Sequence, residues 1–178
     1  DLGGSLQYQR GSENFSRVFG RFDTGSFGPW GTKAWISAAR ATNDLFNGPG
    51  KIEKTQYNAR IYQELDKGDF VSLIINYNEN RNNFIRRGTL AQFKSNTIPV
   101  WDAVCDRPSV AGGAGAQVDP GCGNFYRNNI NPSNTGNIRG QSRFTLTDHL
   151  SLTVDPSFQF VLANGGGRIL FSETDAQL

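Results

Sequence analysis

The sequence predicts an all-β protein with about eight antiparallel strands, and two observations support this prediction. Apolar and polar side chains alternate over long runs, which is the period of a strand and not of a helix. Glycine, asparagine and aspartate gather between these runs, where tight turns are expected. The chain has 178 residues, which suits one domain or part of one.

The longest alternating run is Leu150–Leu162. Its apolar side chains recur at every second position, and only Val161 breaks the pattern. The run has 13 residues, whereas a strand in a globular protein usually has about five or six. Pro156 lies on the apolar side of the run, and a proline is acceptable in a strand only at a bulge or an edge because it has no N–H to donate.

Two neighbouring runs, 56–65 and 69–78, alternate in the same way. They are joined by Asp66–Gly68, where glycine permits the positive φ of a tight hairpin. Weaker runs complete the set. They predict strands at 4–10, 15–24, 32–42, 138–147 and 168–172.

The connections between these strands fall into two alternate sets, which antiparallel pairing places at opposite ends of the sheet. The shorter set comprises 25–31, 66–68 and 148–149. The other set comprises 11–14, 43–54, 80–137 and 164–167, and includes the two longest connections. Short turns at one end and long loops at the other are typical of outer-membrane barrels.

Strand length and polar chemistry favour the same fold. Runs of 10–13 residues are long enough to cross a bilayer at a tilt, which takes roughly 9–11 residues. The polar faces carry Arg60, Glu64, Arg143 and Asp155, which suit a hydrated lumen. We therefore expect residues 1–178 to form part of a single antiparallel, up-and-down transmembrane β-barrel with 80–137 as a long extracellular loop.

The composition excludes several other functions. Lys and Arg number 18 against 16 Asp and Glu, so the charge is too balanced for a nucleic-acid partner. His149 is the only histidine and follows Asp148 at an expected hairpin tip, so no catalytic triad is indicated. No metal or cofactor motif appears, and we expect neither a cofactor nor an enzymatic activity.

Two cysteines, Cys105 and Cys122, lie in the expected long loop. Their spacing and the single histidine argue against a zinc site. A disulfide between them would close a loop rich in glycine and proline and would indicate an oxidising compartment outside the cytoplasm. A pair of free thiols is the alternative.

The same loop supplies the candidate ligand-binding residues. They are Trp101, Phe125, Tyr126 and Arg127. Aromatic rings beside amide and guanidinium groups suit contacts with sugars or peptides. The alternative is that these rings pack the loop against itself.

Several segments resemble the barrel strands and turns of TonB-dependent outer-membrane receptors. They are Phe22–Gly28, Ala34–Ala38, Asn47–Gly50, Tyr57–Arg60, Leu146–Phe160 and Asn164–Gly167. The resemblance covers most of the chain and is weakest in the middle of the long loop. It rests on strand-and-turn patterns and not on a catalytic signature, so no ligand-binding residue is transferred from the family.

The resemblance implies an interior fragment of a larger barrel. Members of this family are 22-stranded barrels with an N-terminal plug that import siderophores, vitamins or carbohydrates. The expected location is the outer membrane of a Gram-negative bacterium. The expected partners are outer-membrane lipid, the remaining barrel and plug, and TonB, which would act through an N-terminal part that this sequence lacks. The sequence also departs from the family in its last residue, Leu178, where an aromatic residue is usual.

Two other interpretations remain open at this point. A complete eight-stranded outer-membrane barrel with a structural or adhesive role predicts that 168–172 pairs with 4–10. A secreted soluble β-sandwich that acts as a binding module predicts buried side chains on the last long run. These side chains are Leu152, Val154, Phe158 and Phe160.

Overall fold

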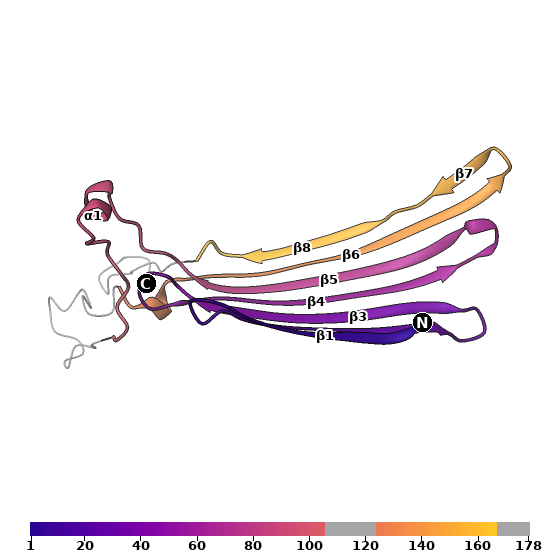
Figure 1. Ribbon diagram of the computed structural model, residues 1–178. Coiled ribbons are helices and arrows are strands. Elements are labelled where there is room, and N and C mark those ends of the chain that lie inside the picture. The colour runs from indigo at the N-terminus through magenta and orange to yellow at the C-terminus, as the bar shows by residue number, and fades with distance from the viewer. Residues whose placement is uncertain (106–123, 167–178) are drawn as a thin grey trace, which may run out of the picture.

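The computed structural model describes residues 1–105 and 124–166, and it contains one antiparallel sheet of eight strands (Figure 1). The fold is all-β, with 63% of the described residues in strands, and the arrangement is up-and-down. The strands are β1 (Leu2–Arg10), β2 (Ser16–Phe27), β3 (Thr32–Asp44), β4 (Lys51–Glu64), β5 (Phe70–Asn83), β6 (Ile130–Thr147), β7 (Leu150–Thr153) and β8 (Ser157–Ala163). The prediction of about eight antiparallel strands is confirmed.

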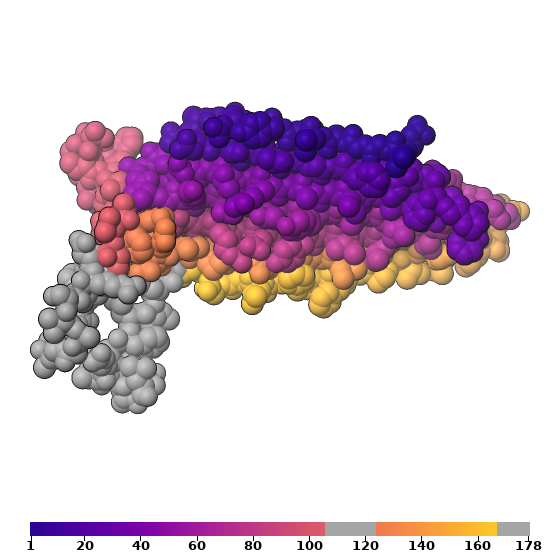
Figure 2. Space-filling model, turned by 90° about the horizontal axis from the view of Figure 1, so that it is seen from below, coloured from indigo at the N-terminus to yellow at the C-terminus, as the bar shows by residue number. Residues whose placement is uncertain are grey.

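The sheet is open within the described part of the chain. β1 forms one edge, and β7 and β8 lie one after the other along the opposite edge, where both pair with β6. Figure 2 shows these edges as the indigo and yellow borders of the molecule. The predicted strand 168–172 lies outside the described residues, so its pairing with β1 is not seen.

The run Leu150–Leu162 forms two strands, so its prediction as one continuous strand is wrong. The chain leaves the ladder at Val154–Pro156, because proline cannot donate a ladder hydrogen bond. Ser142 on β6 compensates: its hydroxyl contacts the backbone O and N of Val154 at 2.7 and 3.2 Å. Asp155 accepts a hydrogen bond from the Ser142 N–H, so it pairs with the β6 backbone instead of lining the polar face as predicted.

The strands extend further into the expected loops than their composition indicates. The predicted loop 43–54 shrinks to 45–50, and the predicted loop 80–137 shrinks to 84–129. The register of β5 and β6 continues without interruption to Asn83 opposite Ile130. The predicted difference in loop length therefore depends on segment 84–129 alone.

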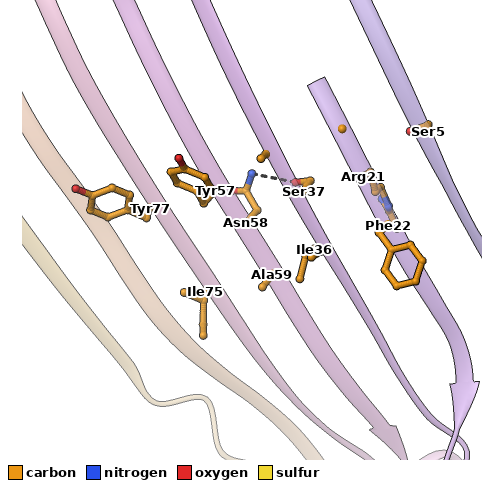
Figure 3. Close-up of a pocket in the computed structure, with 12 residues that line it drawn as sticks. Ser5, Arg21, Phe22, Ile36, Ser37, Tyr57, Asn58, Ala59, Ile75 and Tyr77 are labelled. Carbon is orange, nitrogen blue, oxygen red and sulfur yellow. Dashed lines mark hydrogen bonds between the residues drawn. The ribbon is translucent and has the colours of Figure 1, made fainter. Parts of the chain in front are cut away.

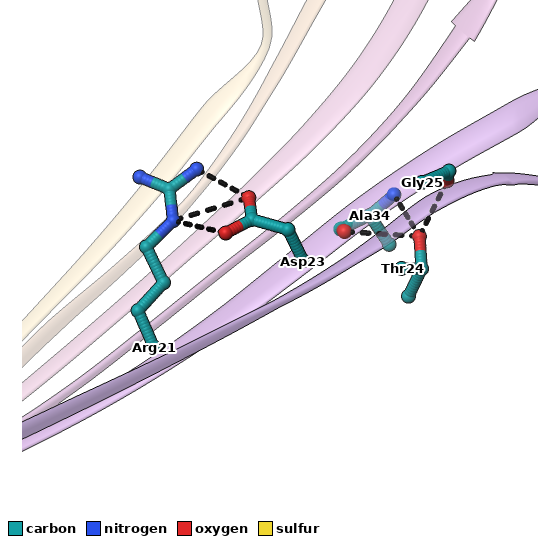
Figure 4. Close-up of polar contacts among 5 residues, drawn as sticks. All are labelled: Arg21, Asp23, Thr24, Gly25 and Ala34. Atoms are coloured by element: carbon teal, nitrogen blue, oxygen red, sulfur yellow. Dashed lines mark hydrogen bonds and ion pairs between the residues drawn. The ribbon is translucent and has the colours of Figure 1, made fainter. Parts of the chain in front are cut away.

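One predicted turn, 25–31, also has narrower bounds. β2 continues to Phe27, and the register shifts between Asp23 and Ser26, where Gly25 has a φ of 63°. This is a β-bulge, and the Thr24 hydroxyl fills the interrupted ladder by accepting a hydrogen bond from the Ala34 N–H at 2.9 Å (Figure 4). The predicted turns at 66–68 and 148–149 are confirmed.

The strand register sorts the side chains into an apolar face and a polar face. Three consecutive rows of the apolar face carry no charge. The middle row runs Gly4, Phe22, Ile36, Ala59, Ile75, Ile138, Phe158. The row on its loop side runs Leu6, Gly20, Ala38, Tyr57, Tyr77, Gly136, Phe160. The row on its turn side includes Ala34, Ile61, Leu73 and Gly140.

The polar face is the more shielded of the two. Along β5, the polar-face positions from Phe70 to Asn78 are half-buried or buried, with Ser72 only 8% exposed. The apolar-face positions Val71, Leu73 and Ile75 between them are exposed. A curved sheet produces this difference when the polar side chains lie on the inner side of the curve.

A hydrophobic core is almost absent from the described residues, where Leu45 is the one buried apolar side chain. The sandwich interpretation requires a second layer over the last strands. Leu152, Val154, Phe158 and Phe160 are instead 46, 49, 64 and 40% exposed. The burial that this interpretation predicts for them is therefore not found within the described residues. Within 1–105 and 124–166, no helix has the length and apolarity to cross a membrane.

Candidate ligand-binding surfaces

The four residues that the sequence singles out lie in one part of segment 84–129. The Asp102 N–H donates to the Asn124 carbonyl at 2.8 Å, and the Tyr126 N–H donates to the Asp102 carbonyl at 3.1 Å. This isolated bridge places Trp101 close to the stretch Phe125–Arg127. The structure thus brings together residues that are more than 20 positions apart in the sequence.

Trp101 is half-buried and is held by its own segment. Its indole N–H donates to the Phe84 carbonyl at 2.5 Å. The Arg86 guanidinium lies over the indole, 5.5 Å from the ring centroid, and donates to the Val100 carbonyl at 2.9 Å. These contacts match the alternative in which the aromatic side chains pack the loop against itself.

Phe125 and Tyr126 meet edge to face, with their ring centroids 5.2 Å apart. Arg127 Nε donates to the Tyr126 hydroxyl at 3.1 Å, and this hydrogen bond raises the pKa of Arg127 above its ordinary value. The two rings are half-buried and Arg127 is exposed. Arg127 is therefore the member of the cluster most open to a ligand.

The histidine lies at the other end of the sheet from this cluster, and one of the two cysteines can be described. Cys105 lies in a disulfide bond, and its predicted partner Cys122 lies outside the described residues. His149 is exposed in the turn between β6 and β7, where its backbone N–H donates to the Thr147 hydroxyl. The described ranges contain no group of three His, Cys, Asp or Glu residues that could hold a metal ion.

The polar face divides into two regions that the sequence analysis did not single out. In one region arginines interleave with aromatic rings, on β2 in the row that continues through Asn58 and on β4 nearer to the short turns. Arg21 binds Asp23 through both carboxylate oxygens (Figure 4). Its guanidinium also lies over Trp35, 4.7 Å from the ring centroid. Arg60 donates to the hydroxyl of buried Ser72 at 2.9 Å and lies over Tyr62 at 5.3 Å.

Nearer to segment 84–129, uncharged amides replace the arginines on the polar face. We define the amide patch as the positions of two adjacent rows on β4, β5 and β6. These are Gln56, Asn58, Asn76, Asn78, Thr135 and Asn137. The signal that could have identified them is the even spacing of Asn76 and Asn78, continued by Asn80 and Asn82, which places all four on one face of an extended strand.

The apolar face carries a hollow of about 540 Å³ (Figure 3). Its lining combines small residues, Gly20, Ala38 and Ala59, with larger ones such as Phe22 and Tyr57. It has almost no polar group to orient a polar ligand, since the Asn58–Ser37 hydrogen bond belongs to the polar face of the same strands. The hollow is therefore a feature of the apolar surface and not a site for a polar solute.

The chain was compared with protein-family models, with curated proteins and with solved structures. None of the three comparisons found a match.

Proposed function

We propose that this chain forms part of the wall of a transmembrane β-barrel in the outer membrane, within a TonB-dependent receptor that imports a nutrient. One observation carries the proposal: the face that the sheet exposes is the apolar face. Ile75 is 41% exposed while its neighbours Ile74 and Asn76 on the polar face are more shielded. A barrel in lipid turns its apolar side chains outward and its polar side chains toward the lumen.

The arrangement of charge supports a bilayer as the surroundings of the apolar face. Beyond the uncharged rows, on the side of segment 84–129, two ion pairs appear: Arg40 with Glu53 at 2.6 Å and Arg81 with Glu79 at 3.4 Å. Between them and the middle row, Tyr57 and Tyr77 stack at 6.3 Å. Aromatic rings followed by charges are expected where hydrocarbon meets the headgroups. In this setting acyl chains fill the hollow of Figure 3.

The open edges support a larger assembly. β1 and β8 each leave one row of backbone groups without a partner in the described sheet, and all side chains of both strands are exposed. Unpaired backbone groups in hydrocarbon cost several kcal/mol each, so a barrel in lipid must close. Further strands of the receptor would pair with these edges.

Import, dependence on TonB and the nutrient ligand are supported by the resemblance of the strands and turns to that receptor family. The described residues of segment 84–129 extend from one end of the sheet, as a ligand-capturing extracellular loop would. Its cluster of Trp101, Phe125, Tyr126 and Arg127 is the candidate for first contact with the ligand.

Membrane fractionation and intact mass of the native protein test this proposal together. We expect the protein in the outer-membrane fraction, soluble only with detergent, with a mass far above the 19.6 kDa of this chain. A detergent-requiring protein of about this mass would support the complete eight-stranded barrel instead. A protein that stays in solution without detergent would contradict both membrane interpretations.

A further inference from the structure

The amide patch differs from the rest of the polar face because it contains no charged side chain. The row through Asn78 runs Gln7, Phe19, Ala39, Gln56, Asn78, Thr135, Val161 and has no ionisable side chain across the whole sheet. The two rows that flank the patch as a whole do carry charges on these strands. Lys54 pairs with Asn80 on one side, and Arg60 and Arg139 flank Ile74 on the other.

Hydrogen bonds within and beside the patch use only part of its capacity. Asn76 Nδ2 donates to Asn137 Oδ1 at 2.8 Å, and Asn58 Nδ2 donates to the Ser37 hydroxyl at 3.3 Å. Each amide carries two donor hydrogens and an acceptor oxygen, so each of these bonds leaves further donors and acceptors available. The patch therefore presents both kinds of group side by side.

Asn78 lies at the centre of the patch and has an unsatisfied hydrogen-bond acceptor. Its Oδ1 is buried and has no hydrogen-bond partner among the described residues. Its neighbours across the ladder are Gln56 and Thr135. A buried acceptor without a donor is costly, so the Asn78 amide gains free energy if its side chain turns to meet a donor that a ligand supplies.

We propose that the amide patch binds a neutral polyhydroxylated solute of the carbohydrate class. A sugar hydroxyl donates and accepts at the same time, which matches an amide, and a neutral ligand leaves no charge unpaired in the charge-free row. An anionic ligand would instead favour the arginine-rich region of the polar face. This inference rests on the proposed function, since it takes the polar face as the lining of the import path.

Binding of two trisaccharides to the intact receptor in detergent tests the inference. The neutral probe is maltotriose and the anionic probe of similar size is trigalacturonate. We expect maltotriose to bind more tightly, and Asn78→Leu to weaken its binding by about tenfold, as the loss of a hydrogen bond in a site built around it would. The control Ile75→Leu, on the apolar face of the same strand, is expected to leave binding unchanged.

A second variant and a measurement of folding distinguish a loss of binding from a loss of structure. Thr135→Val removes the hydroxyl opposite Asn78 with little change in shape, and we expect a smaller loss of maltotriose binding. Circular dichroism reports whether each variant keeps its β structure. If maltotriose does not bind, if trigalacturonate binds better, or if folded Asn78→Leu and Thr135→Val both bind as the wild type does, the inference is wrong. These results leave membrane insertion intact, whereas a receptor that needs no detergent would overturn the proposed function itself.

Discussion

The apolar and polar faces of this sheet are built from alternate residues of the same strands, yet they meet different surroundings. On β5, Ile74 and Ile75 are adjacent residues of the same type. Ile74 is half-buried among polar side chains, and Ile75 is exposed in an uncharged row. In a water-soluble protein the shielded face would be the apolar one. The difference teaches that exposure must be considered together with polarity before the inside of a β-sheet is assigned.

Placing a charge on each face separates the two environments most strongly. We expect Ile75→Lys to destabilise the folded protein in a bilayer by about 2–4 kcal/mol, the range for lysine or arginine near the midplane on the lipid face of a barrel. Ile74→Lys should cost less, because its side chain enters the polar face, where repulsion from Arg60 and Arg139 is smaller than the cost of a charge in hydrocarbon. Urea unfolding of both variants in lipid vesicles measures the difference. Equal losses would contradict the assignment of the faces.

Packing within the apolar face provides a smaller test. The Phe160 ring lies over Gly136 so closely that a Cβ at this position would clash with it, and the ring also contacts Tyr77 at a centroid distance of 6.2 Å. We expect Gly136→Ala to displace the ring and to cost about 1–3 kcal/mol, as overpacking does.

The matched control is Gly3→Ala, because no atom lies within 4 Å of a Cβ added there. Unfolding of both variants under the same conditions measures the effect. A Gly136→Ala variant as stable as Gly3→Ala would show that Phe160 does not cover β6 as described.

The smallest expected effect lies outside both faces, at the turn before β5. Asp69 accepts hydrogen bonds from the Thr145 N–H and hydroxyl, both at 2.7 Å, and these bonds lower the pKa of Asp69 below its ordinary value of 3.8. At pH values above this ordinary pKa the ionised carboxylate therefore stabilises the fold. Its contribution declines as the pH falls from there through the lowered folded-state pKa.

Unfolding midpoints measured against pH for the wild type and Asp69→Asn test this point. We expect the wild type to lose more stability than the variant as the pH falls below about 4. Asp66→Asn, in the same turn, serves as a control that should behave as the wild type does. Parallel curves for Asp69→Asn and the wild type would show that the turn does not depend on the carboxylate.

The alternation of side chains was sufficient to predict the strands and their faces, because the period of two follows directly from strand geometry. It assigned Val71, Leu73, Ile75 and Tyr77 to one face, and the register confirms this assignment. It also assigned Arg60, Glu64 and Arg143 to the polar face, as the structure does.

The strand ends could not be predicted in the same way. Asn80–Asn83 has the composition of a turn, since asparagine favours local hydrogen bonds to its own backbone. The structure instead pairs it with Ile130–Ser133, some 50 positions away. Pairing over this distance depends on the whole ladder and leaves no local signal.

The candidate site shows the same limit. The sequence identified Trp101 and Phe125–Arg127 by residue type, and the Asp102–Phe125 bridge explains why they come together. It did not identify the amide patch, because that surface exists only when β4, β5 and β6 lie in register. The contact of Gly140 could not be predicted from the sequence either. Its N–H donates to the Pro156 carbonyl at 2.8 Å, which requires the two segments to lie side by side.

Spin labels on the matched isoleucines test the assignment of the faces most directly. Ile74→Cys and Ile75→Cys would each be labelled in the native protein in lipid vesicles, and collisions with oxygen and with a water-soluble nickel complex would be measured. Because oxygen concentrates in hydrocarbon, we predict that the label at position 75 collides mainly with oxygen and the label at position 74 does not. A label at position 75 that the nickel complex reaches as readily as the label at position 74 would contradict a lipid-facing apolar side.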